Sequence, residues 1–121
     1  MNRILIVDDA AIMRLTIKGI LEKNNVEVVG EADCGKEGIM KYKDLKPDIV
    51  TMDITMPDIT GIEAVKEIIK YDKNAKIIMV SAMGQERFVM EAVKAGAKSF
   101  LVKPFKEEYM MQVINKVITS K

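Results

Sequence analysis

Short apolar runs alternate with segments of helical periodicity along the whole chain. The runs at residues 4–7, 48–52, 77–80 and 100–102, with a fifth at 26–32, are typical of buried strands. Helix-like segments separate and follow them, which is the order expected of repeated strand–helix–strand units. Because no linker rich in Pro, Gly or Ser interrupts this order, we interpret residues 1–121 as one domain, with no second domain attached.

Five helices are predicted from apolar residues that recur every three or four positions. The first follows from a row made of Ile12, Leu15, Thr16, Gly19 and Ile20. Others are expected over 36–43, 61–70 and 86–95, and the inward residues of the last of these are expected to be Val89, Ala92 and Val93. The C-terminal helix has the clearest stripe, which consists of Met110, Val113, Ile114, Val117 and Ile118.

This alternation predicts an α/β protein with a doubly wound parallel sheet. Connections between parallel strands are right-handed, so five such strands carry helices on both faces and form a three-layer αβα sandwich. Both common strand orders of this class leave a crevice at the carboxyl ends of the strands, where such sheets bind ligands. The residues that end the strands are therefore the first candidates for a site.

Four strand candidates end in residues suited to phosphoryl chemistry. Asp8 and Asp9 follow the first run, Asp53 the third, Ser81 the fourth and Lys103 the fifth. If the strands are parallel, these side chains share the crevice. Three carboxylates at close range repel one another unless a cation lies among them, and a set of oxygen ligands alone favours Mg²⁺ over zinc.

This set of groups can transfer a phosphoryl group. The reaction needs mainly positioning and charge neutralisation. Asp53 is the natural acceptor, because a carboxylate can take the group in line while Mg²⁺ and Lys103 stabilise its oxygens. Ser81 adds a hydroxyl donor.

Composition and charge exclude several other classes. The hydrophobic share of 49% and charged share of 31% are typical of a soluble globular protein. A net charge of +1 gives no support for nucleic-acid or membrane binding, and the N-terminus resembles neither a signal peptide nor a spanning helix, so we predict a cytoplasmic protein. With no histidine and only Cys34, the chain offers no imidazole catalysis, no histidine-bound zinc and no intrachain disulfide.

Four motifs in order resemble the receiver domain of two-component response regulators. They are the segments 4–9, 47–57 with Gly61, 80–82 and 100–105, and the similarity covers essentially the whole chain. The resemblance implies a flavodoxin-like sheet of strand order 2-1-3-4-5 with five helices, and a single receiver domain at 1–121 without an output domain. Within the family, the chain is most similar to stand-alone chemotaxis regulators.

The resemblance also implies a role for each site residue. Asp53 is phosphorylated from the phosphohistidine of a histidine kinase, and Asp9, Asp53 and the Thr55 backbone carbonyl bind Mg²⁺, with Asp8 acting through a metal-bound water. Ser81 moves to bond the phosphoryl group, while Phe100 swings inward as its partner in the switch. Lys103 bridges to the phosphoryl group, and the Lys103–Pro104 peptide bond is cis.

The implied function is a phosphorylation-activated switch that controls flagellar or archaellar motor switching in chemotaxis. Such a protein catalyses only its own phosphorylation and dephosphorylation and is not otherwise an enzyme. The implied partners are a CheA-like histidine kinase, a motor-switch or adaptor protein and a phosphatase of the CheC or CheX type, and the chain is expected to be a monomer. The helix over 86–95, the strand at Phe100 and the last helix are expected to present the signal.

Alternatives stay open at this point. Taken one at a time, these features have simpler explanations: a helix N-terminus for Asp8 and Asp9, a turn for Asp53, a helix cap for Ser81 and a solvated surface position for Lys103. Their joint occurrence at one edge of the sheet favours a functional site. A phosphorelay carrier, a binding module that is not phosphorylated and a Mg²⁺-dependent aspartyl phosphatase are the rival functions. The phosphatase is disfavoured because Asp53-Ile54-Thr55 lacks a second Asp. Thr55 and Met83 occupy two positions that tune the phosphoryl lifetime in the family, so this lifetime stays open. Phe100 stands where many chemotaxis regulators have tyrosine, so the partner surface stays open as well.

Overall fold

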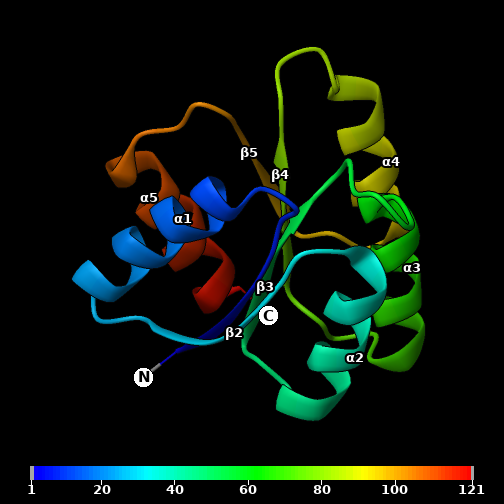
Figure 1. Cartoon of the computed structure of the whole chain (residues 1–121), viewed down its shortest axis with the longest axis horizontal. Helices are drawn as coiled ribbons and strands as arrows, with labels where there is room; N and C mark the ends of the chain where they lie inside the picture. The colour runs from blue at the N-terminus through cyan, green and yellow to red at the C-terminus, as the bar shows by residue number, and fades with distance from the viewer. Residues whose placement is uncertain (1, 121) are drawn as a thin grey trace.

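The structure is a computed structural model, and it describes residues 2–120. Five strands alternate with five helices along the chain (Figure 1). In chain order these are β1 (Arg3–Val7), α1 (Ala11–Lys23), β2 (Glu27–Ala32), α2 (Gly35–Leu45), β3 (Ile49–Asp53), α3 (Gly61–Tyr71), β4 (Ile77–Ser81), α4 (Glu86–Ala95), β5 (Ser99–Val102) and α5 (Glu107–Thr119).

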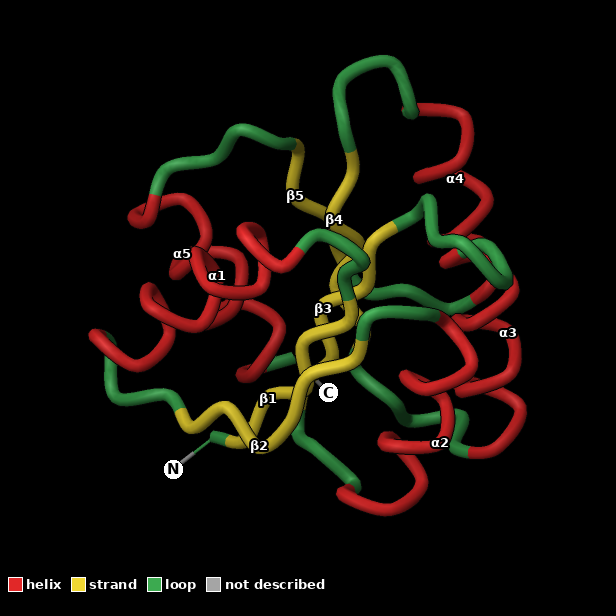
Figure 2. Tube along the Cα trace, viewed as in Figure 1, coloured by secondary structure: helices red, strands yellow, loops and turns green. Residues whose placement is uncertain are grey.

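All strand pairs are parallel, and the sheet has the order β2-β1-β3-β4-β5. The sheet lies between two layers of helices, with α1 and α5 on one face and α2, α3 and α4 on the other (Figure 2). The predicted doubly wound αβα sandwich and its strand order are therefore confirmed. No helix between residues 2 and 120 combines the length and apolar character that crossing a bilayer requires.

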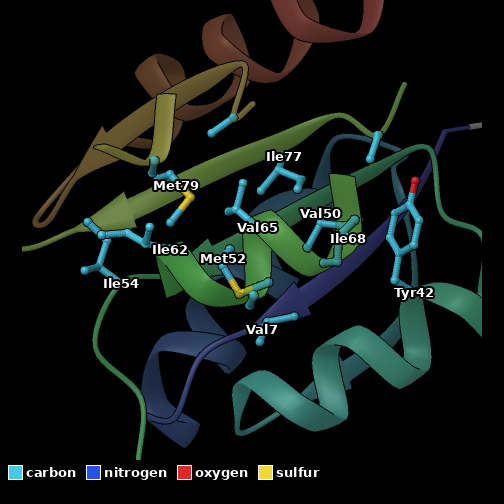
Figure 3. Close-up of a cluster of buried hydrophobic side chains, with 14 of the residues drawn as sticks. Val7, Tyr42, Val50, Met52, Ile54, Ile62, Val65, Ile68, Ile77 and Met79 are labelled. Atoms are coloured by element: carbon cyan, nitrogen blue, oxygen red, sulfur yellow. The ribbon is translucent and has the colours of Figure 1, made fainter. Parts of the chain in front are cut away.

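Each face of the sheet has its own hydrophobic core. Because side chains alternate along a strand, Val50 and Met52 of β3 face α2, α3 and α4, while Ile49 faces α1 and α5. On the first face, Val65 and Ile68 of α3 pack on the strands (Figure 3). On the second, α5 contributes the buried residues Met110, Val113, Ile114 and Val117, which matches the predicted stripe.

Two predicted helix faces differ from the structure. In α1 the buried residues are Ile17 and Leu21, whereas Ile12 and Leu15 of the predicted row are 77% and 70% exposed. In α4 the prediction that Val93 is buried is wrong, because it is 44% exposed. Val89 and Ala92 are the buried residues of α4, whereas Val93 lines a groove between this helix and β5.

The loop after β3 is held in place at the start of α3. Thr60 forms a capping box with Glu63, in which the Thr60 hydroxyl accepts from the Glu63 N–H at 3.2 Å. At the first residue of α3, the Gly61 N–H donates to the Ile54 carbonyl at 2.7 Å. A Cβ atom on Gly61 would lie 2.1 Å from the Asp53 carbonyl oxygen, so only glycine permits this approach. The loop therefore returns directly onto the end of β3.

Candidate phosphoryl-transfer site

The carboxyl edge of the sheet gathers the predicted polar residues. Asp8 and Asp9 follow β1, Asp53 ends β3, Ser81 ends β4 and Lys103 follows β5. One carboxylate oxygen from each of the three aspartates lies within 4.8 Å of the others. Because β1, β3, β4 and β5 are parallel neighbours, their ends meet at the same edge. The fold thus brings together groups that lie far apart in the sequence.

Asp8 is the most deeply buried of the three aspartates, with 1% of its surface exposed. One carboxylate oxygen, Oδ1, accepts from the Ala10 N–H at 2.9 Å, and the other, Oδ2, lies 3.2 Å from the Lys103 ammonium. The Asp8 carbonyl also accepts from the Arg14 guanidinium at 2.7 Å. These contacts fix the carboxylate at the start of α1, while Asp9 beside it is exposed.

Lys103 is the cation of the site. Its Nζ atom lies 3.2 Å from Asp8 Oδ2 and 3.6 Å from Asp53 Oδ1, so one ammonium faces two carboxylates. The Lys103 backbone N–H donates to the Ser81 carbonyl at 2.7 Å, which ties the residue to the end of β4. The Lys103–Pro104 peptide bond is cis, as the family resemblance implies.

Asp53 has an unusual electrostatic environment for an aspartate. Its side chain is 9% exposed, and Oδ1 accepts from the Ile54 N–H at 2.9 Å. Burial and the neighbouring Asp8 charge raise its pKa to about 6, although the Lys103 ammonium opposes this shift. The carboxylate is thus half-protonated near pH 6 and mostly ionised at neutral pH, and shifts of this size are common at functional sites.

The donor set suits a hard divalent cation. Three carboxylates supply oxygen atoms, while the sole cysteine, Cys34, lies just before α2. A single ammonium, that of Lys103, faces these carboxylates, and burial and the Asp8 charge together raise the pKa of Asp53. The acidic cluster therefore fits a metal site. Thr55, whose carbonyl the resemblance adds to this set, is exposed two residues beyond Asp53.

The two residues expected to switch, Ser81 and Phe100, line one cavity. Ser81 is 1% exposed, and its hydroxyl donates to the Leu101 carbonyl at 3.3 Å. Phe100 of β5 is 41% exposed and lines a mostly apolar cavity of about 380 Å³ between α4 and β5, as Ser81 does. Ser81 therefore stands between the acidic cluster and the cavity that Phe100 borders.

Two side-chain contacts near the site were missing from the sequence analysis. The Asp58 carboxylate accepts from the Gly35 and Lys36 N–H groups at 2.9 and 2.8 Å, and so joins the loop after β3 to the first turn of α2. The Gln85 side chain accepts from the Ala82 N–H and donates to the Thr55 hydroxyl, and so joins the loops that follow β4 and β3. Neither residue follows a strand, so the rule that identified the other site residues did not apply to them.

Comparison with known proteins gives the family. Residues 4–115 match the model of the response regulator receiver domain. The chain therefore belongs to the response regulator receiver family, and it is a signalling protein rather than a classical enzyme. The chain is 61% identical to the chemotaxis protein CheY of Thermotoga maritima, over 96% of this chain and 97% of that protein. It is 56% identical to CheY of Bacillus subtilis, over 97% and 98%.

Solved structures agree with this assignment. A complex of CheX with CheY, BeF₃ and Mg²⁺ from Borrelia burgdorferi contains a chain that is 36% identical to this one, with a TM-score of 0.93. The match covers 98% of this chain and 90% of that one. The response regulator domain of Thermotoga maritima CheB is 35% identical, with a TM-score of 0.91 over 100% and 98% of the two chains.

Proposed function

We propose that the chain is a chemotaxis switch that is phosphorylated on Asp53 by a histidine kinase. The observation that carries this proposal is the position of Asp53 at a strand end, buried beside Asp8 and 3.6 Å from the Lys103 ammonium, with its pKa raised to about 6. Burying an ionised carboxylate beside a second one costs folding free energy. This arrangement therefore suits a group that binds a ligand rather than one that stabilises the fold. The two CheY relatives that cover almost the whole chain support the link to chemotaxis.

In the transfer step, an Asp53 carboxylate oxygen forms a bond to phosphorus. The bond from phosphorus to the donor's imidazole nitrogen breaks at the same time, and its electron pair stays on the imidazole. The product is an acyl phosphate on Asp53 and an unmodified histidine on the kinase. Residues 1–121 contain no histidine, so they do not supply the donor imidazole themselves.

A Mg²⁺ ion suits the acidic cluster next to Asp53. We assign Asp9, Asp53 and the Thr55 carbonyl as its direct ligands, and Asp8 as a ligand through water. When bound, the ion neutralises charge on the phosphoryl oxygens. Asp8 also holds the Lys103 ammonium at 3.2 Å, which positions this cation for another phosphoryl oxygen.

After transfer, Ser81 and Phe100 carry the signal. The Ser81 hydroxyl forms only a long bond of 3.3 Å to the Leu101 carbonyl, so a phosphoryl oxygen is a better acceptor for it. Its movement frees space toward the cavity that Phe100 borders, and Phe100 turns inward. This changes the surface formed by α4, β5 and α5, and the phosphoryl charge of about −2 biases the equilibrium between the two packings.

The proposed partners follow from the same chemistry. A CheA-like histidine kinase donates the phosphoryl group, a motor-switch or adaptor protein reads the changed surface, and a CheC- or CheX-type phosphatase ends the signal. The relative from Borrelia burgdorferi was solved with CheX, which supports the last of these. We place the protein in the cytoplasm as a monomeric receiver.

Intact-mass spectrometry after incubation with acetyl phosphate and Mg²⁺ tests this function. We expect one phosphoryl adduct on the wild-type chain, none with EDTA and none on the Asp53→Asn variant. The Asp58→Asn variant is the matched control, because Asp58 is exposed in the next loop and bonds α2 instead of the cluster. It should still be phosphorylated. A folded wild-type chain that forms no adduct would leave only a phosphorylation-independent binding module.

A further experiment separates the switch from a relay carrier. The phosphorylated chain is mixed with an isolated histidine phosphotransfer domain, and the location of the phosphoryl group is followed by mass. We expect water, rather than a histidine, to receive it. Efficient passage to the histidine would instead assign the chain to a phosphorelay, and hydrolysis of an added phosphomonoester would assign it to the phosphatases.

A further inference from the structure

The loop between β4 and α4 is closed by one side chain. This loop covers residues 82–85, and Gln85 precedes the first residue of α4. The Gln85 side chain does not cap its own helix. Its Oε1 atom instead accepts from the Ala82 N–H at 2.7 Å, and its Nε2 atom donates to the Thr55 hydroxyl at 3.0 Å. One amide thus joins both loops that border the site.

Both partners of Gln85 lie within two positions of a residue that takes part in the proposed reaction. Ala82 directly follows Ser81, the hydroxyl that must move toward the phosphoryl group. Thr55 lies two residues after Asp53. While Gln85 occupies the Ala82 N–H, this backbone donor cannot turn toward an anion on Asp53, and the start of the loop stays where the bond holds it.

The rest of the loop offers little resistance to movement. Ala82, Met83 and Gly84 are all exposed, and Gly84 has a φ of +90°, a conformation in which glycine is favoured. A Cβ atom on Gly84 would meet nothing within 4 Å. Since packing does not fix these three residues, the two bonds of Gln85 are the main contacts in the structure that set the loop's position.

We propose that Gln85 is a positioning residue that latches the β4–α4 loop in its unphosphorylated position, through Ala82 and Thr55. The inference rests on the proposed function, because the latch acts on Ser81 and on the phosphoryl group. Phosphorylation releases the latch when a phosphoryl oxygen competes for the Ala82 N–H. The latch therefore lowers the affinity of the resting chain for a phosphoryl group, and it delays the switch until Asp53 is modified.

Beryllofluoride with Mg²⁺, as a phosphoryl analogue, measures this effect by amide NMR. The Gln85→Met variant keeps the length of the side chain and removes both bonds. We expect it to bind the analogue about five-fold more tightly, the fold-change that corresponds to about 1 kcal/mol of net hydrogen bonding. In the ligand-free variant, the Ala82 amide signal should also move toward its position in the ligand-bound wild type.

Three further variants make the test specific. Thr55→Val removes the acceptor of the Gln85 Nε2 atom and keeps the bond to Ala82, so its effect should be smaller than that of Gln85→Met. In a Gln85→Met background, Thr55→Val should have almost no additional effect, since the bond it breaks is already absent. The control is Arg87→Ala, because Arg87 is exposed in the same helix and shows no hydrogen bond or ion pair within residues 2–120.

The outcomes separate this inference from the proposed function. If wild type binds the analogue and Gln85→Met binds it equally or more weakly, with the Ala82 signal unmoved, the latch is wrong and the switch remains. A wild-type chain that does not respond to the analogue at all overturns the proposed function and the latch together. A melting temperature measured for each variant shows whether a change in binding reflects loss of the fold.

Discussion

The end of β3 and the loop that follows it hold two aspartates in opposite electrostatic surroundings. Asp53, at the strand end, is 7% exposed and lies beside Asp8, so burial and like charge raise its pKa to about 6. Asp58, five positions later, is exposed and accepts N–H groups at the first turn of α2. Hydrogen bonds from the backbone N–H groups of Lys36, Ile59 and Gly35 hold the pKa of Asp58 below its usual value.

The comparison separates two uses of one residue type. An ionised Asp53 costs folding free energy unless a cation neutralises the charge around it. Asp58 in the same state supports the fold, because backbone donors at a helix start prefer a negative partner. The strand end is therefore arranged for a ligand, and the loop is arranged to hold that strand end in place. Four variants or conditions test this contrast.

The largest stability effect is expected from Asp53→Asn in EDTA. The pKa rises from 3.8 to about 6 in the folded state, so at pH 7.5 the variant should be more stable than wild type by about 2–3 kcal/mol. The folded state binds the Asp53 proton more tightly than the unfolded state does. The stability of wild type therefore falls as the pH rises from about 4 through 6.

Urea denaturation at several pH values measures the difference. The advantage of Asp53→Asn should vanish below about pH 3, where both the folded and the unfolded wild-type chain carry a proton on Asp53. A constant difference from pH 4 to 7.5 would show that repulsion at the strand end is not its cause.

The contact between the two regions is tested by Gly61→Ala. The new Cβ atom would lie 2.1 Å from the Asp53 carbonyl oxygen and 2.9 Å from the Ile54 Cα atom, so the backbone must shift. We expect a loss of about 2 kcal/mol or more and slower phosphorylation, because the strand end moves. The matched control is Gly19→Ala, whose Cβ atom meets nothing within 4 Å. It should stabilise α1 by about 0.5–1 kcal/mol. Equal effects at both glycines would contradict the contact.

Magnesium should stabilise the strand end and leave the loop unaffected. At ten times its dissociation constant, one bound ion stabilises the fold by about 1.4 kcal/mol. Since a proton on Asp53 competes with the ion, this gain should be smaller at pH 5 than at pH 7.5. Thermal unfolding with and without Mg²⁺ measures it in wild type, Asp9→Asn and Asp58→Asn. Only Asp9→Asn should lose the gain, and a loss in Asp58→Asn would break the comparison.

The smallest effect is expected from Asp58→Ala. The lowered pKa means that Asp58 contributes stability above about pH 4 and loses it as the pH falls further, so this variant should be less stable than wild type above about pH 4 and approach it in acid. The sign is opposite to that of Asp53→Asn. Hydrogen exchange at the Gly35 and Lys36 amides should be faster in the variant, and unchanged exchange would show that Asp58 does not hold α2.

Periodicity predicted much of the architecture because the central strands β1, β3 and β4 are buried on both faces of the sheet. Runs such as 4–7 and 77–80 are continuous apolar segments for this reason, and the strand ends stand out where the runs stop. The stripe on α5 was readable because this helix lies flat on the sheet and buries Met110, Val113, Ile114 and Val117. In α1 and α4 the apolar residues continue around the helix, so spacing alone misplaced part of the buried face.

The site was predictable to the same extent. Asp8, Asp53, Ser81 and Lys103 are encoded by a local rule, since each terminates or directly follows a strand. Gln85 and Asp58 obey no such rule, because their partners Thr55 and Gly35 lie 30 and 23 positions away. Contacts at this separation depend on the relative placement of whole strands and helices, which one segment of sequence does not specify.

The sequence by itself therefore determined the class of fold, the residues at the strand ends and the phosphoryl chemistry that those residue types permit. The tertiary structure decided which carboxylate Lys103 approaches more closely, how far burial raises the pKa of Asp53, and which side chain closes the loop over Ser81. The physical reason is range. Periodicity and strand termination are local properties, whereas charge coupling and cross-loop hydrogen bonds arise only after distant segments have packed together.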